Sequence, residues 1–358
     1  MDQLNTVSSI KYIEVSQEKI KIQDNKDGIH YQVKTISKIQ FNQLIKQIWR
    51  PFMNIFKKPI LIFTFLLFTL NLFLLMGSAN TVNYPLTIID DTGSAVTIPQ
   101  EPQRIISTAP SNTEILFDLG LQEKIVGITN YCNFPEETKN IEKIGEISPL
   151  NFEKIISLNS DLILAYAGFQ LKEIPRLREL GLNTIVLEPL TLDDTFKSVE
   201  MIANVCGISD KGSLLVDNLT QRVNIIKSKA SKIPASARPK IFVGGTSETI
   251  FTPGAGTLFN ELITLAGGQN IAADLSFWKK ISPEFVAQAE PDIIIVPVGV
   301  MNQGEESKIK NNISQRPGWS NIPAIKNQRI FIVNEDLFYR AVPRLVDGLE
   351  LLYGIFYE

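Results

Sequence analysis

Few side chains in this chain have the types and spacing that enzyme chemistry usually requires. The only histidine is His30, so the sequence from residue 53 onward contains none. This absence excludes Ser-His-Asp and Cys-His catalysis there, and it removes the imidazole ligands on which zinc and many other transition-metal sites rely. We therefore expect no catalytic residues and no bound transition-metal ion in that part of the chain.

The two cysteines, Cys132 and Cys206, are the remaining candidates for sulfur chemistry. Neither belongs to a C-x-x-C pair or stands beside a histidine, so a catalytic thiol is not expected. In an oxidising compartment an even pair can form a bridge. Two alternatives stay open: two separate buried thiols, or a disulfide that links Cys132 to Cys206, which we take as a hypothesis.

Other common site patterns are also missing. Carboxylates such as Asp90, Asp91 and Glu248 could serve an exported hydrolase, but their spacing matches no recognisable hydrolase pattern. The glycine-rich segment "VGGTSETIFTPGAGTLFNE" matches neither G-x-G-x-x-G nor the Walker spacing with its lysine. A net charge of -3 without a basic stripe argues against nucleic acid as a partner.

The segment 53–79 has the layout of an export signal. Lys57 and Lys58 precede an apolar run that ends at Met76 and is followed by Gly77-Ser78-Ala79. Its length suits either a cleaved signal peptide or an N-terminal membrane anchor. Both place the C-terminal part outside the cytoplasm, in a periplasmic or other extracytoplasmic compartment, and cleavage would leave a mature chain that begins near Asn80.

Residues 1–52 are polar and rich in Ile and Lys, without a run able to form a core. Two interpretations remain for this extension. It is either a cytoplasmic tail, or a stretch upstream of a true start at Met53, since export signals normally stand at the extreme N-terminus.

The elements that would position a site alternate between short strands and helices, which predicts an α/β fold with mainly parallel sheets. "LTIIDDTGSAVTIPQEPQRIIS" predicts a β-hairpin that leads into a third strand. In "APSNTEILFDLGL", Ser111 or Asn112 is the expected N-cap of a helix.

Between two such α/β regions, the stretch from Ser209 to Ile233 is a single amphipathic segment that stops before Pro234. It predicts a long helix over 208–234 that joins an N-terminal lobe, 84–207, to a C-terminal lobe, 238–358. The lobes also resemble each other, because "ISPLNFEKIISLNSDLILAYAG" corresponds to "ISPEFVAQAEPDIIIVPVG". A small ligand is expected in the cleft between them, at the strand ends.

Several motifs carry a resemblance to a known family. They are "RIISTAPSNTEILFDLG", "NFEKIISLNSDLIL", "FTPGAGTLFNELITLAGGQNIA", "ISPEFVAQAEPDIIIV" and "YRAVPRLVDGL". Over residues 84 to 358 the chain resembles the periplasmic binding proteins of ABC importers for cobalamin and ferric siderophores. The resemblance implies the class III fold, two Rossmann-like lobes joined by one long helix, and a monomeric, non-enzymatic binding protein without a cofactor.

The chain is most similar to the cobalamin-binding branch, which implies a ligand site of aromatic and polar side chains. In that branch aromatic side chains from both lobes flank the flat corrin, and a few polar groups fix its orientation. One position departs from the branch, because Ile147 stands where it carries a tryptophan. The matching positions here are Tyr131, Tyr166, Trp278, Asp336 and Arg340, and Phe251 is a further candidate ligand contact.

The same resemblance implies the partners. Glu153 and Glu284 each follow an Ile-Ser-Pro sequence and match the glutamates with which each lobe meets the permease dimer. The expected function is to capture cobalamin or a related corrinoid and deliver it to a permease with its ATPase subunits. A ferric siderophore or haem is the alternative ligand, and an exported, membrane-anchored α/β enzyme is the alternative function.

Overall fold

The computed structural model describes residues 15–16, 19–20, 82–245, 247, 249–299 and 305–358. The chain divides into two compact units, Met1–Ala79 and Asn80–Glu358. The described residues of the first unit form the short antiparallel strands β1 (Val15–Ser16) and β2 (Lys19–Ile20). The proposed export segment 53–79 lies outside the described residues. Among the helices that are described, none is long and apolar enough to cross a membrane.

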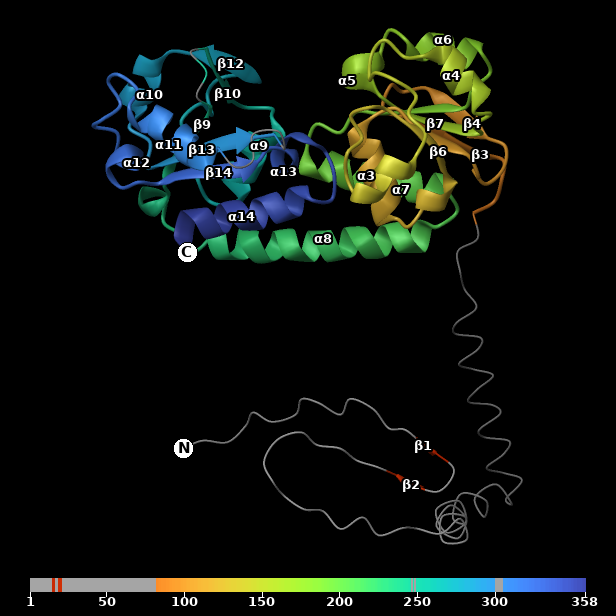
Figure 1. The fold of residues 1–358 in the computed structure, drawn as a ribbon, viewed down its shortest axis with the longest axis horizontal. Coiled ribbons are helices and arrows are strands. Elements are labelled where there is room, and N and C mark those ends of the chain that lie inside the picture. The colour runs from red at the N-terminus through yellow and green to blue at the C-terminus, as the bar shows by residue number, and fades with distance from the viewer. Residues whose placement is uncertain (1–14, 17–18, 21–81, 246, 248, 300–304) are drawn as a thin grey trace. The chain divides into compact units, whose positions relative to one another are not determined.

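The second unit is built from two lobes that are joined by the long helix α8 (Ser209–Ala230), as Figure 1 shows. The predicted α/β class and its two lobes are confirmed. Ile208 is the N-cap of α8, and the helix ends at Ala230, before the expected Ile233. The helix α14 (Leu345–Tyr357) packs along α8 and closes the chain.

The N-terminal lobe holds a four-stranded parallel sheet and a hairpin. The sheet has the order β6-β5-β7-β8, and the hairpin pairs β3 with β4. The strands are β3 (Leu86–Ile89), β4 (Ala95–Ile98), β5 (Ile105–Ser107), β6 (Ile125–Ile128), β7 (Leu162–Tyr166) and β8 (Thr184–Leu187). The helices are α3 (Pro110–Asp118), α4 (Phe152–Ser157), α5 (Ala167–Gln170), α6 (Ile174–Glu179) and α7 (Leu192–Val205).

The C-terminal lobe repeats this plan. Its parallel sheet has the order β11-β9-β13-β14, and a separate antiparallel pair joins β10 to β12. The strands are β9 (Lys240–Val243), β10 (Ile250–Pro253), β11 (Gln269–Asn270), β12 (Trp278–Ile281), β13 (Ile293–Val298) and β14 (Ile330–Asn334). The remaining helices are α9 (Leu258–Leu265), α10 (Pro283–Ala289), α11 (Glu306–Ser314), α12 (Pro323–Lys326) and α13 (Asp336–Tyr339).

The two parallel sheets share one topology. In each, the second strand of the sheet lies at one edge and the first lies beside it, followed by the third and the fourth. The matching Ile-Ser-Pro segments lead into α4 and β7 in one lobe and into α10 and β13 in the other. The internal repeat that the sequence suggests therefore extends to the order of the strands.

The helix α3 begins earlier than the sequence predicts. Pro110 occupies its first turn and Ala109 is the N-cap, so neither Ser111 nor Asn112 caps it. Proline suits a first helical position because its missing N–H would have no partner there. Thr113 and Glu114 lie within the helix, and both side chains are buried.

Apolar side chains hold the lobes together as well as filling each of them. Leu192 and Phe196 of α7 belong to the same buried cluster as Leu262 of α9 and Leu349 of α14. Since α7 belongs to the N-terminal lobe, this cluster continues the core of the C-terminal lobe across the junction.

Candidate ligand-binding cleft

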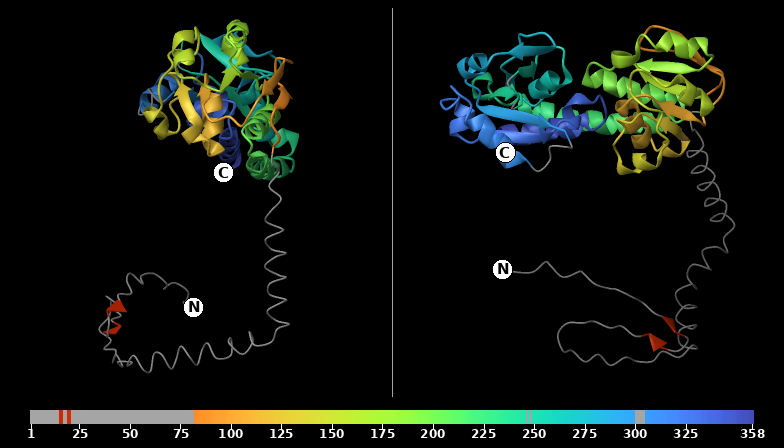
Figure 2. Two further views of the ribbon diagram at one scale, coloured as in Figure 1. Left: turned by 90° about the vertical axis from the view of Figure 1, so that its right-hand side faces the viewer. Right: turned by 45° about the horizontal axis from the view of Figure 1, so that its top comes forward.

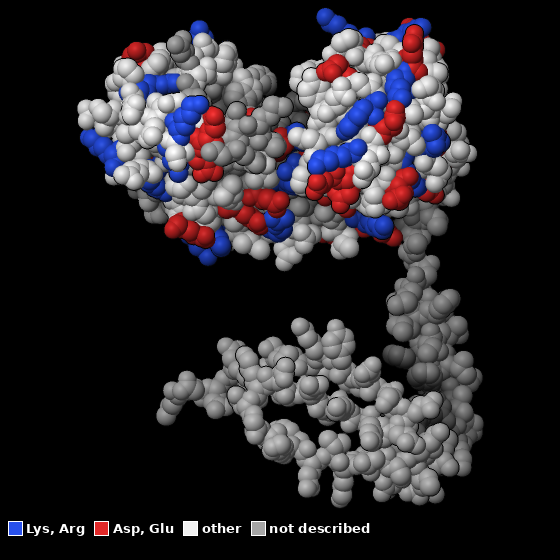
Figure 3. All heavy atoms as spheres, in the orientation of Figure 1, with Lys and Arg blue, Asp and Glu red and all other residues white. Residues whose placement is uncertain are grey.

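The carboxyl ends of the parallel strands supply most of the predicted binding residues. Tyr131 follows β6, Tyr166 ends β7, and Asp336 follows β14. Open parallel sheets bind ligands at this edge, where the strands stop and loops begin. In Figure 3 the molecular surface is hollowed between the two lobes, on the side opposite α8.

Large aromatic side chains are exposed on both lobes. On the N-terminal lobe Tyr131 is 52% exposed, and on the C-terminal lobe the values are 54% for Phe251 and 44% for Trp278. None of these three aromatic residues is buried in the core. Tyr166 is partly buried and lies 5.8 Å from the ring of Phe169, centroid to centroid.

Four exposed aromatic residues escape the sequence analysis. They are Phe134, Phe169, Phe277 and Tyr339. Tyr339 meets Trp278 edge to face, with ring centroids 5.2 Å apart. Phe277 precedes β12 with a φ of 54°, an uncommon left-handed conformation for an aromatic residue. The signals that could have found them are their positions beside predicted aromatic residues, as in "AYAGF" and "SFW".

The phenol of Tyr131 has a fixed partner. Its hydroxyl donates to Glu146 Oε2 at 2.7 Å, and Asn130 donates to the other oxygen at 2.9 Å. The hydrogen bond to Glu146 raises the pKa of Tyr131, because the carboxylate favours the protonated phenol. The Tyr131 ring is therefore held in place as a neutral aromatic surface.

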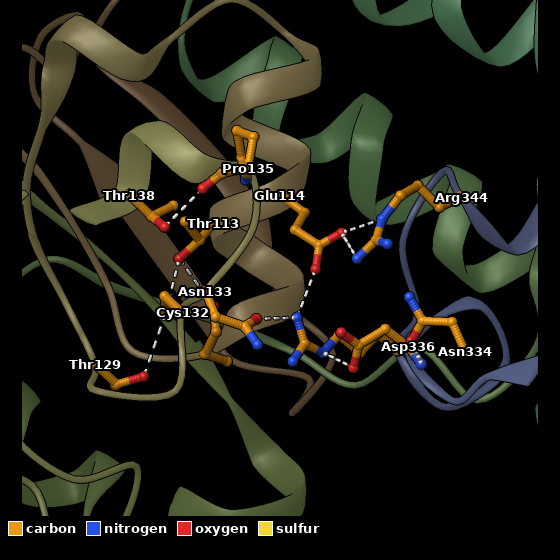
Figure 4. Close-up of polar contacts among 12 residues, drawn as sticks. Thr113, Glu114, Thr129, Cys132, Asn133, Pro135, Thr138, Asn334, Asp336 and Arg344 are labelled. Carbon is orange, nitrogen blue, oxygen red and sulfur yellow. Dashed lines mark hydrogen bonds and ion pairs between the residues drawn. The ribbon is translucent and has the colours of Figure 1, made fainter. Parts of the chain in front are cut away.

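Arg340 joins the two lobes through a buried ion cluster. Its Nη1 donates to Glu114 Oε1 and to Asn133 Oδ1, both at 2.8 Å and both on the N-terminal lobe. Its Nε lies 3.0 Å from Asp336 Oδ1. Figure 4 shows the carboxylate of Glu114 pointing from α3 toward the C-terminal lobe, with Asn133 and Asp336 nearby.

A second arginine, Arg344, completes this cluster. Its Nε and Nη2 lie 2.7 and 2.6 Å from Glu114 Oε2, and its guanidinium is 3.8 Å from the ring centroid of Phe134. The Glu114 side chain is only 2% exposed. Burial raises the pKa of Glu114, while the charges and hydrogen bonds of Arg344 and Arg340 act in the opposite direction.

A second carboxylate also links the two lobes, and it belongs to the C-terminal lobe. Glu261 of α9 accepts a hydrogen bond from the backbone N–H of Leu192 at 2.9 Å. A carboxylate at this position complements the N-terminus of α7, whose first N–H groups lack partners within the helix. Each lobe thus contributes one buried or partly buried carboxylate to the other.

The two candidate docking residues occupy equivalent places. Glu153 lies in the first turn of α4, capped by Asn151, and Glu284 lies in the first turn of α10, capped by Ser282. Both glutamates are exposed. The helices α4 and α10 lie on the side of the molecule away from α8 (Figures 1 and 2).

The hypothesis of a disulfide is wrong for this structure, in which Cys132 and Cys206 are both free and buried. Cys132 follows the carboxyl end of β6, where Thr113 donates to its sulfur at 3.1 Å. Cys206 follows α7 as its C-cap and interacts electrostatically with Lys124 and Glu101. Lys124 directly precedes β6, and Glu101 precedes β5. Cys132 therefore lies toward the carboxyl ends of the parallel strands, and Cys206 lies toward their amino ends.

The candidate enzyme carboxylates are structural where they are described. Asp90 is buried and accepts hydrogen bonds from the hairpin, while Asp91 accepts from the backbone N–H of Glu188 at 2.6 Å. Glu248 lies outside the described residues. Within the described ranges, no group of three His, Cys, Asp or Glu side chains is arranged to hold a metal ion.

Comparison with known proteins places this geometry in a family. Residues 105–337 match the family model described as periplasmic binding protein. An uncharacterised ABC transporter substrate-binding lipoprotein of Bacillus subtilis, YvrC, is 34% identical over 274 residues, which cover 75% of this chain and 84% of the relative.

Two solved structures are similar to the whole second unit. The vitamin B12-binding protein BtuF of Vibrio cholerae is 28% identical with a TM-score of 0.61, covering 72% of this chain and 97% of that protein. The haem-binding protein RhuT of Roseiflexus is 27% identical with a TM-score of 0.63, covering 71% and 98%. These relatives share an architecture and differ in what they bind.

Proposed function

Because this chain belongs to the periplasmic binding protein family, whose members here are substrate-binding proteins of ABC transporters and not enzymes, we propose that it captures a corrinoid between its lobes. Such proteins work with a permease and its ATPase subunits. The chain would deliver its ligand to such a permease from outside the cytoplasm.

The observation that carries the proposal is the presence of exposed aromatic side chains on both lobes. Tyr131 and Phe169 belong to one lobe, and Trp278 with Tyr339 belongs to the other. Aromatic rings bury a large flat surface at low entropic cost, and exposed groups of this size usually mark a binding site. A flat macrocycle held between two such surfaces fits this distribution.

The polar groups are few, as expected of a site that orients a large ligand. Arg340 and Asp336 lie beside the aromatic residues of the C-terminal lobe, at the start of the segment that follows β14. We assign them the role of contacting the polar substituents at the edge of the macrocycle.

The choice between a corrinoid and haem rests on the axial ligand. Haem iron in proteins is held by His, Cys, Met or Tyr, whereas cobalamin carries its own axial groups. The described residues contain no histidine, and both cysteines are buried. The Tyr131 phenol already donates to Glu146, which favours its protonated form. The lack of a described histidine and the burial of both cysteines favour the corrinoid, while the exposed Tyr339 keeps haem, as in RhuT, beside a ferric siderophore as the second candidate.

Export is part of the same proposal. The periplasmic and lipoprotein relatives, together with the basic flank and apolar run of segment 53–79, support a location outside the cytoplasm. N-terminal sequencing of the native protein tests the cleavage. We expect a mature chain that begins near Asn80, and a native chain that still carries residues upstream of Met53 would contradict both cleavage and the start at Met53.

The ligand is tested by calorimetric titration of the full-length protein in mild detergent with cyanocobalamin, cobinamide, haemin and a ferric hydroxamate. Binding of cyanocobalamin or cobinamide at least ~10-fold tighter than haemin and the hydroxamate supports the proposal, a difference of ~1.4 kcal/mol. Preferential binding of haemin or of the ferric hydroxamate would transfer the assignment to that ligand class.

A further inference from the structure

Arg340 is held by a carboxylate that belongs to the opposite lobe. The side chain comes from the C-terminal lobe, directly after α13, yet two of its three acceptors, Glu114 and Asn133, belong to the N-terminal lobe. Of these two acceptors on the N-terminal lobe, Glu114 is a buried carboxylate, whereas Asn133 is a neutral, exposed amide. Charge-assisted hydrogen bonds of this kind are the stronger ones.

The contacts leave one end of the guanidinium unused. Nη1 and Nε of Arg340 donate to Glu114, Asn133 and Asp336. No hydrogen bond to a described residue occupies Nη2, and Nη2 is not among the buried unpaired atoms, so it remains in contact with solvent. The cluster therefore fixes one side of the planar group and directs the other side outward.

Fixing Arg340 in advance has a consequence for binding. A free arginine side chain has large rotamer entropy, part of which is lost when it contacts a ligand. Groups that are already ordered lose less on binding, and affinity rises accordingly. Asn133 and Asp336 alone leave Nη1 without a charged acceptor.

We propose that Glu114 is a positioning residue, which holds the Arg340 guanidinium across the lobe junction with Nη2 directed at the ligand. This inference rests on the proposed function for the role of Arg340. It assigns to Glu114 an effect on ligand affinity that is exerted only through Arg340. Arg344 has the complementary part, since its Nη2 lies 2.6 Å from the second oxygen of Glu114 and its charge opposes the rise in the pKa of Glu114 that burial causes.

The first test needs no ligand. Full-length wild-type protein and the variant Glu114→Gln are treated with phenylglyoxal, and modification of Arg340 is followed by peptide mass mapping. The loss of the charged acceptor should raise the modification rate about fivefold or more, because a hydrogen bond to a charged group contributes more than a neutral one. The matched control is Glu261→Gln, the other carboxylate at the lobe junction, which contacts only a backbone N–H and should leave the rate unchanged.

The second test measures cyanocobalamin affinity in Glu114→Gln, Arg340→Ala and the double variant. Glu114→Gln should weaken binding about tenfold. It should add nothing in the Arg340→Ala background, because residues that act through one another are not additive. Glu261→Gln should leave the affinity unchanged and show no coupling to Arg340→Ala. If Glu114→Gln does not fold, Glu114→Asp keeps the charge with a shorter reach and should give intermediate values.

The outcomes separate this inference from the proposed function. An unchanged Arg340 modification rate in a folded Glu114 variant, or additive effects on affinity, would overturn the positioning role. A wild-type protein that binds no corrinoid would contradict the proposed function instead, and the modification experiment would still decide whether Glu114 holds Arg340.

Discussion

Asp90 and Arg178 form an ion pair across 88 positions of sequence, with Arg178 Nη2 2.5 Å from Asp90 Oδ2. The same carboxylate accepts from the backbone N–H of Val186 at 3.1 Å and from the Thr92 hydroxyl at 2.6 Å. Asp90 lies in the turn between β3 and β4, whereas Arg178 lies on α6 and Val186 on β8. The Asp90 side chain therefore attaches the hairpin to the rest of the N-terminal lobe.

Replacing Asp90 with Ala should therefore destabilise the protein by about 2–3 kcal/mol. Removing one partner of a buried pair leaves the other uncompensated, and the value stays below the usual range because the Arg178 side chain is 30% exposed. Urea unfolding measures the change. The control is Asp193→Asn, in an exposed pair with Lys197, which should change stability by less than about 0.5 kcal/mol.

The two tryptophans of the second unit differ in exposure, and this separates binding from folding. Trp278, a proposed ligand contact, is 44% exposed, whereas Trp319 is 1% exposed in the core. Trp278→Ala should weaken corrinoid binding about 3- to 10-fold or more, since aromatic contacts contribute about 0.5–1.5 kcal/mol beyond buried area. Trp319→Phe should lower the melting temperature and leave affinity unchanged. Calorimetry and thermal unfolding measure both; equal effects on affinity would contradict the cleft assignment.

Glu153 and Glu284 should act on delivery and not on capture. The double variant Glu153→Ala and Glu284→Ala is expected to bind ligand normally, while transport into cells or permease vesicles falls, because charge pairs at an interface rim govern encounter and orientation. Glu306 lies exposed in the first turn of α11, so Glu306→Ala controls for the loss of a helix-dipole charge. Normal delivery by the double variant would remove the docking role.

Asp118 at the end of α3 should make stability depend on pH. Desolvation, together with the nearby charge of Glu114, raises the pKa of Asp118 to about 6 although part of its side chain is exposed. A raised carboxyl pKa means that the folded state binds the proton more tightly than the unfolded chain. The protonated Asp118 side chain therefore contributes its full stabilisation below the unfolded-state pKa of about 4. This stabilisation is lost as the pH rises through the folded-state pKa of about 6.

The variant Asp118→Asn removes this charge and tests the sign. Its melting temperature should exceed that of the wild type at pH 7.5, and the difference should shrink as the pH falls toward 4. Thermal unfolding over this range measures it. A difference that grows toward low pH would show that the charged form of Asp118 is favoured in the folded state.

The thiols should be chemically silent in the native protein. Burial raises the pKa of Cys206 to about 12, so its reactive thiolate is scarce at neutral pH. We expect no reaction with a thiol reagent in native protein and two labelled cysteines per chain in denaturant without reductant. A chain that shows no thiols in denaturant would contain the disulfide after all.

The sequence predicts the strands and the repeat well, because hydrophobic alternation and Ile-Ser-Pro segments are local signals. It also places Tyr131 and Arg340 in segments that follow parallel strands, whereas Trp278 begins β12, which pairs with β10 outside the parallel sheet. The start of α3 is missed because Ser111 and Asn112 are good caps, and only the fit of Pro110 in the first turn decides otherwise.

Glu114 could not be predicted as part of the site. In the sequence it is an ordinary helix-start glutamate, and its significance depends on two arginines that approach from the other lobe. The sequence separation of Glu114 and Arg340, 226 positions, leaves no local signal for such a contact. The absence of the disulfide has a similar cause, since only the sheet places Cys132 and Cys206 toward opposite ends of its strands.

The single passage of the chain between the lobes, through α8, implies an order of folding during synthesis. Every strand of the N-terminal sheet precedes α8, so this sheet can form before the C-terminal half has been made. Leu192 and Phe196 pack against residues that follow α8, so their apolar surfaces stay uncovered until that half arrives. An N-terminal lobe that forms first therefore exposes an apolar patch at the lobe junction until the C-terminal half covers it.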